Sequence, residues 1–189
     1  KLEEIIIHNN INLNIKNDIL NNLTFLYEKN LLLISTKEIS KALKNIELVE
    51  SFEIKKIYPN KIKIKIFEKK LIAIVQDKKE KFYITEKGGL INFTNLEQLE
   101  KLPLVFGGKY NFKNLYDNLM NMNFPLDTIQ TFYYFESNRW DLVTKNNQTI
   151  KLPIKNFEES LKSYMNLKKQ GNFEKYKIFD YRIKDQLIL

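Results

Sequence analysis

Few side chains in this sequence could take part in catalysis, and they do not form a recognisable set. His8 is the only histidine and cysteine is absent, which excludes the usual zinc sites and every nucleophilic triad that relies on histidine. The best catalytic candidate is Asp180, two residues before Arg182, a spacing that places both side chains on one face of an extended strand. The same spacing also suits a structural ion pair. We therefore expect no enzymatic activity, no metal and no cofactor.

Arginine is rare enough in this chain to single out the positions where it occurs. Lysine supplies all but two of the 31 basic residues, and the two arginines are Arg139, beside the only tryptophan, and Arg182. A guanidinium offers a planar fork of donors that an ammonium lacks. Each arginine is expected either to pair with an acid inside the fold or to contact a partner, and Arg182 is the stronger candidate for partner contact.

The last residues of the chain are a second candidate for binding. The segment from Arg182 to Leu189 is strand-like, and Gln186–Leu189 ends it without a charged residue. Natural sheets usually protect an exposed edge with charge, so an unprotected edge invites a partner to add a strand. The alternative is that this strand lies inside the sheet.

The net charge of +8 is spread along every segment of the chain and is not gathered in one region. Nucleic-acid binding is not expected, because it would favour arginines clustered on one face. A solvated cationic surface explains the lysines, and contact with anionic lipid is the most plausible functional use of them. The sequence contains no stretch of about 18 apolar residues, and it begins at Lys1, so we expect that a preceding segment has been removed.

The elements that must position these residues fall into two parts. In Lys61–Ile66, lysine and isoleucine alternate, which predicts a strand with one buried face, paired as a hairpin with the preceding residues around Glu53. Two amphipathic helices precede the hairpin, and the second is predicted to begin with a capping box formed by Ser35 and Glu38. Residues 1–70 are therefore predicted to form an α+β domain in the order β-α-α-β-β.

Residues 71–189 are predicted to form a mainly antiparallel β domain with two helices, which begin near Phe112 and Phe157. The segment Leu102–Gly107 is predicted to be a short edge strand, because Pro103 cannot donate to a sheet. No Pro/Gly/Ser-rich linker separates the two parts.

Several short motifs resemble those of one protein family in their order and spacing. They are Lys29-Asn30-Leu31-Leu32, Val49, Lys56-Ile57-Tyr58-Pro59-Asn60, Glu68-Lys69 with Ala73, Gly88, Leu102-Pro103 with Gly107, Arg139-Trp140, Leu152, and Ile178-Phe179-Asp180-Tyr181-Arg182. The first part resembles a POTRA domain, and nearly the whole chain resembles the extracytoplasmic part of the FtsQ/DivIB cell-division family, of the Gram-negative FtsQ type. Where this family often has an aromatic residue after the arginine, the chain has Ile183.

The resemblance implies a non-enzymatic divisome scaffold. Such a protein is held in the inner membrane by one transmembrane helix before Lys1, lies on the periplasmic side at the septum, and links early and late division proteins. The implied partners are FtsB- and FtsL-like proteins, bound by strand addition at the last strand. The residues assigned to this contact are Arg182, Ile183, Gln186, Leu187 and Ile188. Glu53 and Lys55, on the first hairpin strand, are assigned to a recruitment surface.

Three other interpretations remain open at this point. A POTRA-containing component of outer-membrane protein assembly or secretion would bind unfolded chains. A nucleic-acid-binding protein would bind with a steep salt dependence. A cell-wall hydrolase would depend on Asp180.

Overall fold

The computed structural model describes residues 1–9, 15–94, 101–171, 173–183 and 186–189. The described residues separate into two compact units, one ending at Lys70 (unit 1) and the other starting at Leu71 (unit 2). Within this part of the chain, no helix is both long and apolar enough to span a bilayer.

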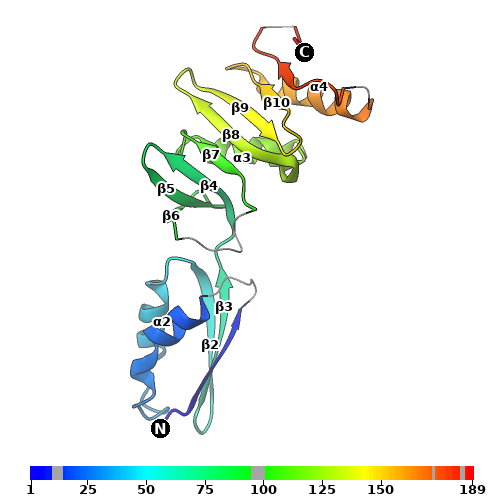
Figure 1. Cartoon of the computed structure of the whole chain (residues 1–189). Helices are drawn as coiled ribbons and strands as arrows, with labels where there is room; N and C mark the ends of the chain where they lie inside the picture. The colour runs from blue at the N-terminus through cyan, green and yellow to red at the C-terminus, as the bar shows by residue number, and fades with distance from the viewer. Residues whose placement is uncertain (10–14, 95–100, 172, 184–185) are drawn as a thin grey trace. The chain divides into compact units, whose positions relative to one another are not determined.

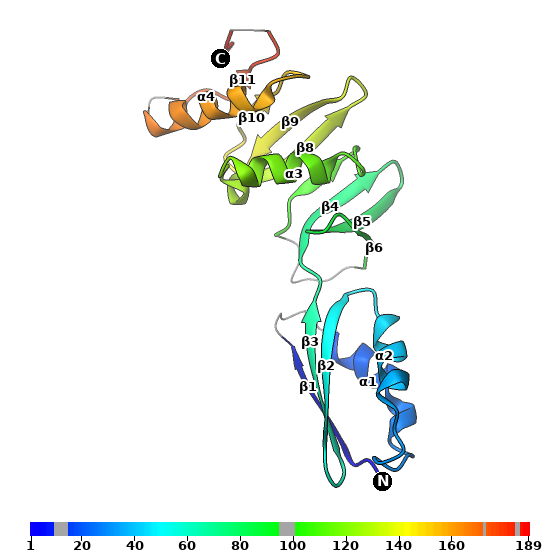
Figure 2. The same cartoon turned by 180° about the vertical axis from the view of Figure 1, so that it is seen from behind.

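Unit 1 is a three-stranded sheet with helices on one face (Figures 1 and 2). Its elements are β1 (Glu4–Asn9), α1 (Lys16–Asn22), a 3₁₀ turn (Thr24–Leu26), α2 (Thr36–Lys44), β2 (Val49–Ile57) and β3 (Lys61–Glu68). The central strand is β3, with β1 parallel to it on one side and β2 antiparallel on the other. Ile62, Ile64 and Ile66 are fully buried under the helices, whereas Lys61 and Lys63 are exposed on the open face. The alternation of lysine and isoleucine therefore buries one face of β3 and exposes the other, as predicted.

The predicted capping box at the start of α2 forms only in part. The Ser35 hydroxyl accepts a hydrogen bond from the backbone N–H of Lys37. The Glu38 side chain does not reach back to the cap but pairs with the Lys29 ammonium at 2.8 Å. Glu38 thus ties the first turn of α2 to the loop that precedes it.

Unit 2 is one eight-stranded sheet with two α-helices. Its elements are β4 (Leu71–Asp77), β5 (Glu80–Thr85), β6 (Leu90–Asn92), β7 (Leu104–Phe106), α3 (Phe112–Asn121), a 3₁₀ turn (Leu126–Thr128), β8 (Ile129–Phe135), β9 (Arg139–Thr144), β10 (Thr149–Lys151), α4 (Phe157–Lys169) and β11 (Ile178–Asp180). The strand order is β11-β10-β9-β8-β7-β4-β5-β6. Four of the described pairings are antiparallel and three are parallel, so the sheet is mixed.

The prediction that Leu102–Gly107 forms an edge strand is wrong. The strand β7 lies in the middle of the sheet and pairs in parallel with β4 on one side and β8 on the other. Pro103 stands just before the strand, where its missing N–H is not needed, and its carbonyl accepts a hydrogen bond from Ile74 at 3.0 Å. A proline at this position is therefore compatible with a central strand.

Both helices of unit 2 pack on the same face of its sheet (Figure 2). Phe112 of α3 contacts Phe132 and Trp140 edge to face, and Tyr164 of α4 contacts Phe179 of β11 in the same way. Side chains of the opposite set on each strand point away from the helices, since successive residues alternate between faces. This second face, called the open face of unit 2, carries the charged residues described next.

Candidate functional site: an edge strand and its charged row

The strand β11 forms one edge of the sheet of unit 2, beside β10. The backbone carbonyl of Lys177 accepts a hydrogen bond from the backbone N–H of Thr149, and the backbone N–H of Tyr181 donates one to the carbonyl of Lys151. Every second residue of this segment is therefore bonded to β10. The intervening residues, Ile178 and Asp180, direct their backbone N–H and C=O groups outward. These outward groups are the positions at which an added strand could pair.

The end of the chain covers part of this edge. The Asp180 N–H donates to the Ile188 carbonyl at 2.9 Å, and the Ile188 N–H donates to the Asp180 carbonyl at 3.1 Å. Among the described residues this bridge is the only pairing on the outer side of β11. Ile178 is outside the bridge and 44% exposed, so the N-terminal half of the edge is open.

The prediction of a continuous strand from Arg182 to Leu189 is wrong for the residues that the structure describes. The strand ends at Asp180, and the chain turns back so that Ile188 meets it. The strand ends here for a local reason. The Asp180 carboxylate accepts a hydrogen bond from the backbone N–H of Arg182 at 3.1 Å, and the turn that this bond closes competes with extended structure. Residues 184 and 185 lie outside the described part of the chain.

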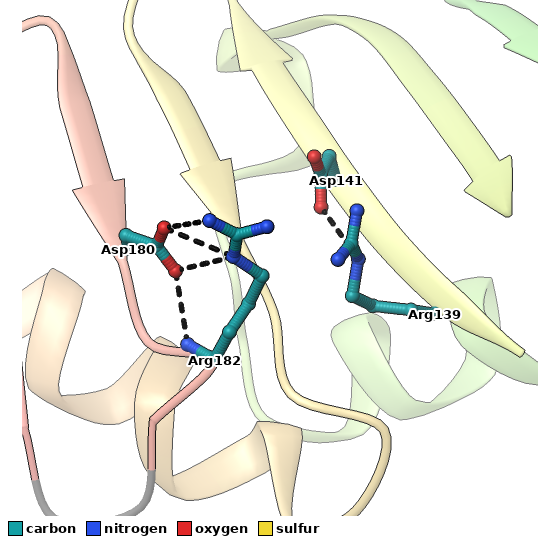
Figure 3. Close-up of polar contacts among 4 residues, drawn as sticks. All are labelled: Arg139, Asp141, Asp180 and Arg182. Atoms are coloured by element: carbon teal, nitrogen blue, oxygen red, sulfur yellow. Dashed lines mark hydrogen bonds and ion pairs between the residues drawn. The ribbon is translucent and has the colours of Figure 1, made fainter. Parts of the chain in front are cut away.

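Asp180 also holds the Arg182 side chain in a fork (Figure 3). Arg182 Nε donates to both carboxylate oxygens, at 2.8 and 2.9 Å, and Nη2 lies 2.5 Å from Oδ2. These hydrogen bonds lower the pKa of Asp180, although burial acts in the opposite direction. A carboxylate held ionised by an arginine is a poor general acid or base at neutral pH. Asp180 therefore has the geometry of a structural ion pair, which was one of its two predicted roles.

A second arginine–aspartate pair lies on the same face, on β9 (Figure 3). Arg139 Nε is 3.3 Å from Asp141 Oδ1, as an ion pair without the alignment of a hydrogen bond. The Arg139 guanidinium also lies 4.3 Å above the ring of Phe135, its neighbour on β8. Arg139 thus pairs with an acid inside unit 2, which was one of its two predicted roles, although its Nε makes no hydrogen bond.

Lys151 of β10 lies between the two aspartates. In the strand register, Lys151 is opposite Asp141 on one side and opposite Asp180 on the other. Burial raises the pKa of Asp141, although Arg139 and Lys151 act in the opposite direction. Asp141, Lys151 and Asp180 are called the charged row. Sequence reasoning missed Asp141 and Lys151, since only the register across three strands brings them to Asp180.

A groove opens beside the charged row, at the end of β11. Its volume is about 900 Å³, and it lies among the start of β9, the loop before α4 and the segment after β11. Four of the five residues predicted to bind a partner line it: Arg182, Ile183, Gln186 and Leu187. Ile154 and Ile183 are both more than half exposed in or beside the groove, so it offers apolar as well as charged surface. Ile188, the fifth predicted residue, forms the bridge to Asp180.

The remaining predicted residues lie in unit 1. Glu53 and Lys55 are exposed on β2, an edge strand, and their side chains point away from the helices, opposite Lys65 and Lys63 of β3. His8 is exposed on β1. Over the described ranges, no three His, Cys, Asp or Glu side chains gather in a way that could hold a metal ion.

Two matches to family models define the class of protein as a POTRA domain followed by a C-terminal β domain of the cell-division type. Residues 1–69 match the family model "POTRA domain, FtsQ-type", and residues 73–182 match "Cell division protein FtsQ/DivIB, C-terminal". The chain therefore belongs to the FtsQ/DivIB family. This family is non-enzymatic, which agrees with the expectation from the sequence, and the FtsQ type of the POTRA match favours it over a component of outer-membrane protein assembly.

Relatives of this chain include proteins named cell division protein FtsQ. The protein from Rickettsia bellii is 32% identical over 157 residues, covering 81% of this chain and 58% of that protein. The protein from Rickettsia conorii is 31% identical over 153 residues, covering 79% and 57%. The chain thus spans a little over half the length of these relatives.

Among solved structures, the chain is similar to the major extracytoplasmic domain of the cell division protein DivIB from Geobacillus stearothermophilus. The identity is 18%, and the match covers 53% of this chain and 91% of that chain. The TM-score is 0.35, too low to bear on the fold.

Proposed function

We propose that this chain is the extracytoplasmic part of a division scaffold, anchored in the inner membrane by one helix before Lys1 and acting on the periplasmic side at the septum. Its partners would be FtsB- and FtsL-like proteins and other members of the divisome. Membership of the FtsQ/DivIB family supports this proposal. The function is to hold other proteins together, and so the essential feature is a binding surface.

The observation that carries the proposal is the open half of the β11 edge. Ile178 directs its backbone donor and acceptor outward, and the groove with Arg182 and Leu187 begins where the strand ends. In strand addition, backbone hydrogen bonds provide affinity and alternate side chains provide specificity. A partner strand would pair beside Ile178 and continue into the groove, either next to the Ile188 bridge or in its place.

The test is calorimetry with the periplasmic part of the FtsB-like protein from the same genome. We expect the 189-residue chain to bind it, and Ile178→Pro to abolish binding, because proline removes the outward donor while Ile178 makes no bond to β10. Ile178→Ala is the matched control, because it shortens the side chain but keeps the backbone N–H. A chain ending at Arg182 should also lose binding, since it lacks Gln186, Leu187 and Ile188.

The fluorescence of Trp140, which is buried in unit 2, would show that each variant is folded. Equal affinity of Ile178→Pro and Ile178→Ala would refute pairing at this edge. No binding by the unaltered chain would refute the assignment of the partner.

We also propose that the open face of β2 recruits the protein to the division site. Glu53 and Lys55 lie there on an edge strand, which pairs with β3 on one side. Exchanging both charges, by Glu53→Lys with Lys55→Glu, should reduce septal localisation of the full-length protein without reducing the calorimetric affinity for the FtsB-like partner. Unchanged localisation would refute this role.

A further inference from the structure

The exposed apolar side chains of unit 1 are not scattered. Every large apolar residue described as exposed in this unit lies in residues 25–33 or is Tyr58. Leu33 is 81% exposed, Leu32 is 69% exposed and Tyr58 is 61% exposed. Two adjacent leucines so fully in water have no role in the core, and a concentrated apolar patch indicates a binding surface.

The turn at residues 30–33 and the turn between β2 and β3 both lie at one end of unit 1 (Figures 1 and 2). The Leu2 N–H donates to the Lys29 carbonyl at 3.0 Å, and the next residue, Glu3, donates to the Asn60 carbonyl at 2.8 Å. Two consecutive residues of the N-terminal segment therefore join the turn that carries the leucines to the β2–β3 turn that carries Tyr58. The end formed by Leu32, Leu33 and Tyr58 is called the apolar tip.

The turn holds the leucines in a fixed position. The Asn30 side-chain oxygen accepts a hydrogen bond from the Leu32 N–H at 3.1 Å, and the Asn30 carbonyl accepts one from the Leu33 N–H at 2.9 Å. Such a turn is a defined conformation and not a loose loop. The backbone conformation of this turn therefore keeps the Leu32 and Leu33 side chains in solvent.

Positive charges flank the apolar tip. The Lys56 ammonium donates to the Ile34 carbonyl, directly after the exposed leucines. Lys29 lies 5.2 Å from the ring of Phe25 and also pairs with Glu38, so its charge is partly compensated. This arrangement combines exposed apolar side chains, a neighbouring tyrosine and nearby lysines. It is typical of segments that lie in the head-group region of a bilayer.

We propose that the apolar tip inserts into the surface of a lipid bilayer and that the flanking lysines contact its anionic head groups. The inference rests on the proposed function in one respect: an anchor before Lys1 would place the N-terminal end of unit 1 next to the membrane, and the hydrogen bond from Leu2 fixes the tip at that end. Because acids pair with some of the lysines, the leucines supply more of the affinity than the charges do.

The test is flotation of the 189-residue chain with vesicles of phosphatidylcholine alone and with added phosphatidylglycerol. We expect binding to both vesicle types, stronger with phosphatidylglycerol. The double variant Leu32→Ser, Leu33→Ser should bind about tenfold or more weakly to both, as removal of a buried leucine from a lipid contact predicts. Met120→Ser is the matched control, because Met120 is 48% exposed on α3 of unit 2, and it should bind like the unaltered chain.

Three results would overturn the inference. The first is that the unaltered chain binds neither vesicle type, and the second is that the double leucine variant binds as strongly as the unaltered chain. The third is binding that depends on phosphatidylglycerol but not on the leucines, which would indicate adsorption of a chain with net charge +8. Circular dichroism of the double variant would confirm that it is folded, as expected for substitutions at exposed positions.

The same variants separate this inference from the proposed function. The double leucine variant should keep its affinity for the FtsB-like partner, whereas Ile178→Pro should lose that partner and keep vesicle binding. Loss of partner affinity in the leucine variant, with vesicle binding unchanged, would assign the tip to a protein and refute the lipid contact.

Discussion

The two aspartates of the charged row should differ in how much stability the chain loses when their charge is removed. Asp180→Asn removes charge-assisted hydrogen bonds at 2.8 and 2.9 Å from Arg182, and it weakens the turn that ends β11. Because the Arg182 side chain is 44% exposed, these bonds are partly screened, and we expect a loss of about 1–2 kcal/mol in the free energy of unfolding at pH 7. Asp141→Asn removes a charge whose burial already raises its pKa, so we expect a change within about 0.5 kcal/mol or a gain.

The assay is urea unfolding at pH 7, followed by the fluorescence of Trp140, the only tryptophan and a buried residue of unit 2. The pKa of Asp180 is lower in the folded chain than the value of about 3.9 in an unfolded chain, so its contribution is complete above that value and is lost as the pH falls through the folded pKa. The pKa of Asp141 is raised, so the cost of its charge is complete above the folded pKa and disappears as the pH falls toward the unfolded value. The difference between the two variants should therefore shrink below about pH 4. Equal destabilisation by both variants at pH 7, or a larger loss for Asp141→Asn, would refute the roles assigned to them.

Three further predictions concern other parts of the chain. Removing the last two residues eliminates the bridge to Asp180, so the Asp180 amide should exchange with solvent about tenfold faster, measured by hydrogen exchange, and an unchanged rate would argue against the bridge. Gly108→Ala should destabilise unit 2 by at least about 1–3 kcal/mol in the same urea assay, because Gly108 has φ of +59° and an added Cβ would lie 2.7 Å from an aromatic ring; a smaller loss would contradict that packing. Lys63→Glu should raise the free energy of unfolding of unit 1, measured by thermal unfolding, by about 0.2–1 kcal/mol, because it replaces a like-charged pair with Lys55 by an oppositely charged pair. A decrease would contradict the register of β2 and β3.

The sequence predicted best where burial follows a local period. The alternation of Lys61–Ile66 predicted the strand, its buried face and its exposed face, all of which the structure confirms. An amphipathic strand needs only its own residues to specify which face is buried. The order of elements in unit 1 was predictable for the same reason.

Predictions failed where a distant residue or a single side chain decides the backbone. The central position of β7 depends on parallel pairing with β4 and β8, 30 and 27 residues away in the register, which no local pattern contains. The end of β11 depends on one carboxylate that captures the backbone of Arg182. The charged row likewise exists only because three strands align in one register.

The place of β7 also has a consequence for the order in which the chain can fold as it is synthesised. The strands β4, β5 and β6 are consecutive and pair locally, so they can form early. Among the described residues, the other side of β4, with five buried residues from Leu71 to Val75, pairs only with residues 103–107. Until those residues arrive, β4 is an apolar edge open to any other extended chain, the condition under which nascent sheets aggregate. A chaperone would therefore be needed most during synthesis of residues 78–106.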